Sequence, residues 1–417
     1  MTSGVDAFVE HLFRHSAGQM VARLARRLGA ARLDLAEEAV QDALVRALST
    51  WPFSGVPAEP RGWLFLVARN RAIDLLRREA SLRGKLGELE SAAVEAWPEQ
   101  GTGLGDDELA MMFMCCHPAL PPPARVALTL KTVGGFSVEE VAAAFLAEPD
   151  TIAQRLVRAK RQIREQAIAI EIPPETELGE RLGSVLDVLY LLFNEGYSAH
   201  GGDNLTRADL CGEAIRLAEI LAGNPASDLP EVHALLALML LQASRLPARV
   251  DASGDLLLLG EQDRGVWDQA LIVRGLRHLE RAASGNRITA YHVEAAIAAT
   301  HVVASDEAST DWPAIVRLYD DLLALKPSPV VELNRAIALA MAKGPAAGIA
   351  ALERVESDPA LSRYSLLPAA LGRLWREAGD AERAARYYED ALARPCSEPE
   401  RRFLERQLTR CRRSAPA

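Results

Sequence analysis

Residues 137–164 carry the pattern that most narrows what this chain can fold into. Ser137, followed three residues later by Glu140, predicts a helix start with a capping box, in which each side chain accepts a hydrogen bond from the other residue's backbone N–H. Glu148, Pro149 and Asp150 then predict a turn that caps a second helix. Apolar residues of that helix recur at i, i+4, i+7 and i+11, namely Ile152, Leu156, Ala159 and Ile163. Two short helices joined by a tight turn predict a helix-turn-helix.

The polar face of the second helix suits contact with DNA. In a helix-turn-helix the second helix enters the major groove, where arginine pairs with guanine and glutamine with adenine. Between residues 151 and 164 there are five Lys or Arg and no Asp or Glu. The residues that we expect to point outward, toward DNA, are Thr151, Gln154, Arg155, Arg158 and Arg161.

The composition extends the helical prediction to the whole chain. Of 417 residues, 49% are hydrophobic and 25% charged, and Ala, Leu, Arg and Glu dominate while β-branched runs are scarce. We therefore predict an all-α protein of two or three domains. The apolar run at 235–241, like every other in the chain, is far shorter than the roughly 20 residues that span a bilayer, and the N-terminus lacks the pattern of a signal peptide, so we expect a cytoplasmic protein without membrane contact.

Five cysteines, an odd number, argue against a disulfide framework. Cys115, Cys116 and His117 are adjacent and raise the alternative of a metal or redox site. Two neighbouring thiols cannot easily face one ion, and no second Cys/His pair lies at zinc-site spacing. We predict that both cysteines are buried in a helix, and we expect no metal and no cofactor.

Changes in composition divide the chain into four parts. A first helical module covers residues 1–80, and a glycine-containing acidic stretch at 81–107 predicts a flexible linker. The helix-turn-helix module follows at 108–170, and an Ala/Leu-rich helical extension fills 175–417 after Pro173 and Pro174. Residues 1–170 hold 20 Lys or Arg and 21 Asp or Glu, so most of the chain's net charge of −10 lies in the extension.

The end of the extension has the spacing of a tetratricopeptide repeat, a pair of antiparallel helices packed through small residues. Gly344 lies 35 residues before Gly379, close to the period of that repeat, and Tyr319 and Pro327 fit a preceding copy. Residues 178–300 are predicted to be helical but fit the repeat poorly. The residues that carry the best match are Leu371, Gly372, Trp375, Gly379, Ala384, Tyr388 and Ala391.

Residues 33–50 predict an amphipathic helix with an acidic face. We expect Asp34 to cap this helix, with Glu37 completing a capping box. One side carries an apolar stripe, and the other carries Glu38, Gln41 and Asp42.

Residues 61–78, after a Pro/Gly-containing turn, predict a basic helix. Guanidinium groups along one helix suit phosphate contacts, and the amide of Asn70 could read a base edge. The polar residues of this helix are Arg69, Asn70, Arg71, Arg77 and Arg78.

This order of acidic helix, basic helix and helix-turn-helix resembles the extracytoplasmic-function (ECF) sigma factors of bacterial RNA polymerase. The resemblance implies that the acidic helix binds the clamp helices of the polymerase β′ subunit, through Asp34, Glu37, Glu38, Gln41 and Asp42. It implies that Arg69, Asn70, Arg71, Arg77 and Arg78 contact the −10 promoter element, with Trp63 packing instead. It also implies that the outward residues from Thr151 to Arg161 read the −35 element.

The strings at 113–120 (FMCCHPAL) and 191–199 (LLFNEGYSA) resemble a subgroup with a tetratricopeptide-like extension. The resemblance implies that the extension, rather than a separate membrane-bound anti-sigma protein, sets the activity. Because tetratricopeptide-like surfaces bind peptides or protein segments, we predict an intramolecular contact between the extension and the sigma modules. A polar and aromatic cluster of Phe193, Asn194, Glu195 and Tyr197 is our candidate for such a regulatory contact, the alternative being a structural turn.

Two other functions compete with a sigma factor. A helix-turn-helix regulator with a ligand- or partner-sensing extension would bind DNA without polymerase. An enzyme would need a nucleotide-binding glycine loop, a metal-spaced histidine cluster or a nucleophile motif, and the extension has none of these, so we predict no enzyme.

Overall fold

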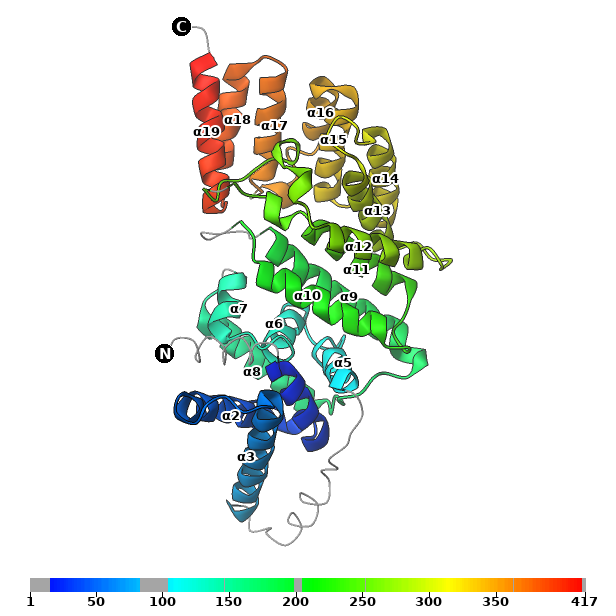
Figure 1. The fold of residues 1–417 in the computed structure, drawn as a ribbon. Helices are drawn as coiled ribbons and strands as arrows, with labels where there is room; N and C mark the ends of the chain where they lie inside the picture. The colour runs from blue at the N-terminus through cyan, green and yellow to red at the C-terminus, as the bar shows by residue number, and fades with distance from the viewer. Residues whose placement is uncertain are drawn as a thin grey trace. The chain divides into compact units, whose positions relative to one another are not determined.

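The computed structural model describes residues 16–82, 104–145, 147–198, 205–251, 253–362 and 364–414. Within these ranges the chain forms helices and turns, with an isolated antiparallel bridge between Val250 and Leu256 and no strand (Figure 1). The all-α prediction is confirmed. The chain divides into two compact units, Met1–Leu191 and Leu192–Ala417.

The first unit opens with a helix over residues 16–28. The elements that follow are η1 (Ala30–Arg32), α2 (Leu33–Ser54), α3 (Pro60–Leu82), α5 (Leu104–Cys115), α6 (Pro122–Thr132), α7 (Val138–Ala144), α8 (Pro149–Glu165) and α9 (Glu175–Tyr197), which runs on into the second unit.

The second unit continues with a series of helices and short 3-10 turns. They are α10 (Ala208–Gly223), α11 (Pro230–Ala243), η2 (Leu246–Ala248), η3 (Leu259–Glu261), η4 (Arg264–Val266), α12 (Gln269–Ala282), α13 (Ala290–Val303), α14 (Trp312–Leu325), α15 (Pro329–Lys343), α16 (Pro345–Leu352), η5 (Pro359–Leu361), α17 (Leu366–Glu377), α18 (Ala381–Leu392) and α19 (Glu398–Ser414).

The helix-turn-helix consists of α7 and α8. The capping box is present: the backbone N–H of Ser137 donates to Glu140 Oε2 at 2.7 Å, and that of Glu140 donates to Ser137 Oγ at 3.0 Å. The apolar residues predicted to face inward from α8 are all buried. The second helix is not capped by a side chain, however, because α8 begins at Pro149 with Glu148 as its N-cap, and Asp150 already lies in the first turn.

The acidic helix starts differently from the sequence prediction. The 3-10 turn η1 runs directly into α2, whose N-cap is Arg32, and no side chain caps it. The predicted capping box of Asp34 and Glu37 is therefore wrong. Asp34 instead lies in the first turn, where a carboxylate interacts favourably with the helix dipole.

Helices α2 and α3 pack against each other through aromatic and small residues. Trp51, at the end of α2, is 1% exposed, and its ring centroid lies 5.3 Å from that of Trp63 on α3. Trp63 is thus a packing residue, as predicted.

The first half of α9 belongs to the first unit. Arg181 donates to the carbonyl of Phe113 at 3.0 Å, and Arg125 of α6 donates to Ser184 Oγ at 2.7 Å. These bonds extend the compact unit beyond the module expected at 108–170. Cys115 ends α5 and Cys116 follows it, both buried as predicted, and burial raises the pKa of Cys116 to about 12.

The segment at 83–103, most of the predicted linker, lies outside the described residues, and α3 and α5 occupy its two ends.

In the second unit, α17 and α18 form a helical hairpin, with α19 packed on α18 (Figure 1). Tyr388 and Ala384 are buried between the helices, as the repeat pattern requires. The prediction of helix throughout the extension fails between α11 and α12, where Val250 and Leu256 form an antiparallel bridge and residues 255–258 form an extended segment. Residues 251–255 (DASGD) are turn-forming residues, which explains this break.

Candidate functional site

The predicted polymerase-binding residues of α2 form one stripe on the outside of the helix. Asp34, Glu38 and Gln41 are exposed, whereas Glu37 and Asp42 are partly buried. The stripe continues one and two turns further with two apolar side chains that the sequence analysis did not single out, Val45 (62% exposed) and Leu48 (38% exposed). Hydrophobic periodicity alone did not distinguish these two exposed side chains from the buried apolar residues of α2.

Arg71 links the acidic helix to the basic one. Its guanidinium is ion-paired with Asp42 and lies 3.6 Å from Glu38 Oε1. The structure therefore brings Arg71 toward the acidic face of α2.

The remaining predicted −10 residues stay on the outer surface of α3. Asn70, Arg77 and Arg78 are exposed, and Arg69 donates to Asn70 Oδ1 at 3.3 Å. Near the turn that joins α2 to α3, Phe53 is 90% exposed. Phe53 was not among the predicted DNA-binding residues, although an aromatic residue beside a Pro/Gly-containing turn was a usable signal.

The predicted −35 residues lie together along α8. Thr151, Gln154, Arg158 and Arg161 are exposed, and Arg155 is half-buried. Thr151, Gln154, Arg155 and Arg158 border a groove of about 320 Å³, lined on its other side by Pro121, Pro123 and Ala124. Arg161 is also 3.1 Å from Glu165 Oε1, one turn further along the helix.

A third face of α8 meets the acidic helix. Lys160 Nζ lies 2.7 Å from Asp34 Oδ1 and 2.6 Å from Glu37 Oε2. Burial alone would lower the pKa of Lys160, but the charges and hydrogen bonds of Glu37 and Asp34 outweigh it and hold that pKa above its usual value. Sequence reasoning missed Lys160 because its partners are more than 120 residues away.

The cluster at the end of α9 is packed within the second unit. The ring of Phe193, 2% exposed, stacks on that of Tyr197 at a centroid distance of 5.8 Å. Arg249 lies 4.0 Å from the Tyr197 ring centroid and donates to its carbonyl. Glu195 is buried and Asn194 partly so. These contacts favour the structural alternative for the cluster.

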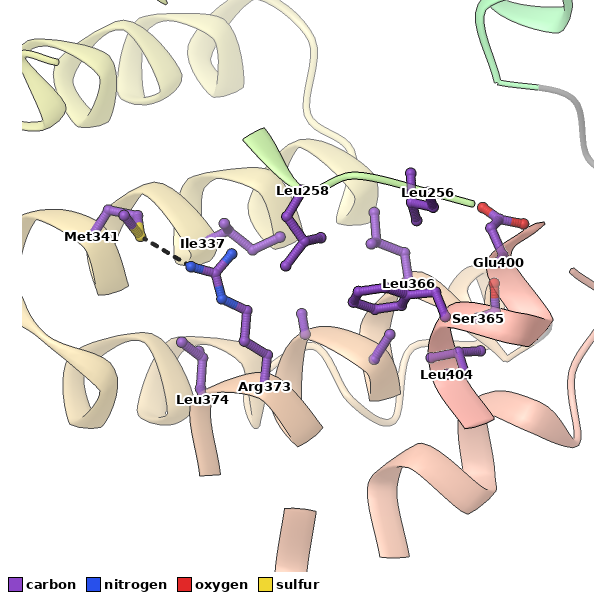
Figure 2. A pocket seen from close by; sticks show the side chains of 13 residues that line it. Leu256, Leu258, Ile337, Met341, Ser365, Leu366, Arg373, Leu374, Glu400 and Leu404 are labelled. Atoms are coloured by element: carbon purple, nitrogen blue, oxygen red, sulfur yellow. Dashed lines mark hydrogen bonds between the residues drawn. The ribbon is translucent and has the colours of Figure 1, made fainter. Parts of the chain in front are cut away.

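An apolar cavity of about 140 Å³ lies between α15, α17, α19 and the extended segment (Figure 2). Leu256 and Leu258 of that segment line one wall, and Arg373 faces Met341 Sδ at 3.9 Å. The segment is held by Asp255, whose carboxylate accepts hydrogen bonds from Arg402, at 2.6 Å, and from Arg406. The helices of the extension thus already hold an extended stretch of their own chain.

Within the described ranges no group of three or more His, Cys, Asp or Glu is arranged to hold a metal ion. Nor does any described helix combine the length and apolarity needed to cross a membrane.

Sequence profiles of two sigma-70 regions match the segments that form these helices. The profile for sigma-70 region 2 covers residues 14–82, which contain α2 and α3, and that for sigma-70 region 4 covers residues 110–163, which contain the helix-turn-helix. A family of unknown function, DUF6596, matches residues 181–283 in the extension.

Two mycobacterial sigma factors are similar to part of this chain. A probable ECF RNA polymerase sigma factor of Mycobacterium tuberculosis, SigI, is 26% identical over 147 residues, 34% of this chain and 50% of that protein. The ECF RNA polymerase sigma factor SigE of Mycolicibacterium smegmatis is 28% identical over 157 residues, 37% of this chain and 60% of that one. The chain belongs to the ECF sigma factors.

This sigma factor also carries a C-terminal extension. An uncharacterized protein of Rhizobium meliloti is 40% identical over 384 residues, 90% of each chain, so the two share the extension as well as the sigma modules. Sigma factors as a family are not enzymes, in agreement with the prediction.

Proposed function

We propose that this sigma factor directs RNA polymerase to its promoters by binding the polymerase through α2 and DNA through α3 and α8. The observation that carries the proposal is the stripe on α2, where exposed carboxylates adjoin the exposed side chains of Val45 and Leu48. An acidic and apolar helix face suits a basic and apolar partner surface, such as the clamp helices of the β′ subunit.

The two DNA-binding faces have different tasks in this proposal. Arg77 and Arg78 contact the backbone of the unpaired −10 strand, and exposed aromatic or amide groups such as Phe53 and Asn70 hold its bases. Helix α8 enters the major groove of the −35 duplex, where Gln154 and Arg158 contact base edges. Opening the DNA in this way needs no covalent chemistry.

The near-neutral charge of the sigma modules fits this division of work. Residues 1–170 have a net charge of −1, so attraction to DNA phosphates alone is weak. The polymerase supplies most of the affinity for DNA, and the sigma modules supply the selectivity among promoters.

Run-off transcription tests the proposal. The full chain, added to purified polymerase core, should produce transcripts from promoters of its own genome that core alone does not produce. A chain that binds DNA fragments yet never associates with core would be a helix-turn-helix regulator, and the proposal would fail.

We also propose that the extension sets the activity of the sigma modules, which lie in the cytoplasm with the polymerase. Truncation tests this, provided that the first half of α9 is kept. Ser184 of α9 accepts a hydrogen bond from Arg125 of α6, and Arg181 of α9 donates one to the carbonyl of Phe113 of α5. A chain ending after Ser198 keeps those bonds, whereas one ending at Pro173 loses them. Altered promoter output from the longer truncation would support regulation, and unchanged output would contradict it.

A further inference from the structure

The N-terminal end of the α2 stripe is covered by the helix-turn-helix module. Besides the two bonds from Lys160, Glu37 Oε1 accepts a hydrogen bond from Thr132 Oγ1 at 3.1 Å, and Arg164 lies 3.7 Å from Asp34 Oδ2. The side chains of Lys160 and Glu37 are only 14% and 13% exposed. Both oxygens of Glu37 are therefore engaged within the chain and have little access to a partner.

Two further contacts join the same modules. A Cβ placed on Gly18 would lie 1.8 Å from the carbonyl oxygen of Val133, so the helix over residues 16–28 lies directly against the end of α6 and tolerates only glycine there. Arg26 of that helix bonds Asp107 of α5 at 2.7 Å. The regions matched by the two sigma-70 profiles thus pack together as parts of one compact unit.

This packing is too compact for simultaneous contact with both promoter elements. The −10 and −35 elements are about 25 base pairs apart, which is about 85 Å of straight duplex at ~3.4 Å per base pair. Measured along the helices at ~1.5 Å per residue, Lys160 is about 14 Å from Thr151, and Arg71 is about 10 Å from Arg78. The path from Thr151 to Arg78 continues from Lys160 to Glu37, along α2 to Asp42, and from Asp42 to Arg71. Its total length, and so the largest distance between the two DNA-binding faces, is roughly 60 Å.

We propose that this arrangement is a closed form of the sigma factor, in which α8 occupies the acidic end of the polymerase-binding stripe and a basic surface of the polymerase must displace Lys160 to bind. The inference rests on the proposed roles of α2 and α8. In the closed form α8 competes with the polymerase for the acidic end of the stripe. Gln41, Val45 and Leu48 stay exposed, and the polymerase contacts them first.

The closed form leaves the DNA-reading face of α8 free. Gln154 and Arg158 remain exposed beside their groove while Lys160 points to α2. The raised pKa of Lys160 keeps its ammonium charged at neutral pH among Asp34, Glu37, Thr132 and Arg164, so a change of pH within the neutral range does not open the contact.

The test compares the full-length chain with its Lys160→Gln variant in direct binding to polymerase core without DNA. Coupling between alternative states of this kind is typically worth 5- to 150-fold in affinity, so we expect Lys160→Gln to bind core roughly 5- to 50-fold more tightly. Lys131→Gln, which removes a lysine of α6 whose charge acts on Glu139 of α7, should bind as the wild type does. Arg164→Ala, a change at an exposed side chain, should give a smaller gain and serves as the second variant if Lys160→Gln folds poorly.

The outcomes separate this inference from the proposed function. Equal and tight binding of core by wild type, Lys160→Gln and Arg164→Ala would overturn the closed form while leaving the sigma function intact. Absence of core binding by all of them would overturn the proposed function itself. Tighter binding by the two variants, with Lys131→Gln unchanged, would support the closed form.

Discussion

Arg71 of α3 is ion-paired with Asp42 of α2, so a residue of the basic helix supports the acidic one. The two side chains are 39% and 43% exposed, and pairs of this kind contribute about 0–1 kcal/mol to stability. The pair joins α3 to the polymerase-binding stripe of α2. Arg71 therefore has a different role from the exposed residues Asn70, Arg77 and Arg78 of the same helix.

Arg71→Gln should therefore act differently from Arg78→Gln. We expect Arg71→Gln to lower the free energy of unfolding by at most about 1 kcal/mol and to weaken binding of polymerase core, because Arg71, which does not cover the stripe as α8 does, no longer holds Asp42 in position on α2. Arg78→Gln should leave core binding unchanged and reduce the salt dependence of binding to unpaired −10 DNA by the holoenzyme. If Arg71→Gln affects only DNA binding, Arg71 does not support α2, and its contact with the −10 element, which the family resemblance implies, is correct instead.

Arg158→Ala tests the reading face of α8. Loss of one base-edge contact should cost about 1–3 kcal/mol of discrimination at a single position of the −35 element, with other positions unaffected. Competition between wild-type and singly substituted promoters measures this directly. Gln166→Ala, at an exposed position just after α8, is the control. Uniform weakening across all sequences would mean that Arg158 contacts only phosphate.

Gly372 allows α17 and α18 to approach closely. A Cβ at this position would lie 3.2 Å from both the Ala384 carbonyl oxygen and the ring of Tyr388. We expect Gly372→Val to destabilise the extension by about 2–3 kcal/mol in denaturant unfolding. Gly212 of α10 has open space around its Cβ position, so Gly212→Ala should be neutral or stabilising by up to about 1 kcal/mol. Equal losses at the two sites would contradict the packing described.

His301 predicts a pH dependence of stability. Burial, with smaller effects of Arg245 and Arg264, lowers its pKa to about 4. The unfolded chain, with a histidine pKa of about 6.5, binds more protons than the folded one between pH 6.5 and 4, so stability falls as the pH falls through that window. The loss reaches at most about 3 kcal/mol. In His301→Gln the difference in unfolding free energy between pH 7 and pH 4.5 should shrink, and an unchanged difference would refute the assignment.

Local patterns predicted much of this fold. The buried positions of α8, the capping box at Ser137 and Glu140, and the buried Tyr388 all follow from spacing within one or two helical turns. The start of α2 was predicted wrongly, because a 3-10 turn and an α-helix with an acidic first turn have the same composition as a capped helix.

What the sequence did not predict depends on contacts between distant segments. The pairing of Lys160 with Glu37 spans 123 residues, and nothing in the local pattern separates Lys160 from the DNA-facing arginines around it. The same is true of Arg71, one of five polar residues that the basic pattern treats alike. The candidate surfaces were thus predictable as helix faces, whereas the contacts that cover or support parts of them were not.

Binding of polymerase core to the α2 stripe is the most direct test of the account. Fluorescently labelled full-length protein should bind purified core saturably, and Val45→Asp, which changes an exposed side chain in the middle of the stripe, should weaken binding at least about tenfold, or by more than about 1.4 kcal/mol. Arg46→Asp, next to it on another face of α2, should change the affinity by less than about twofold. Equal binding by Val45→Asp and wild type, or no binding by any of the three, would contradict the account.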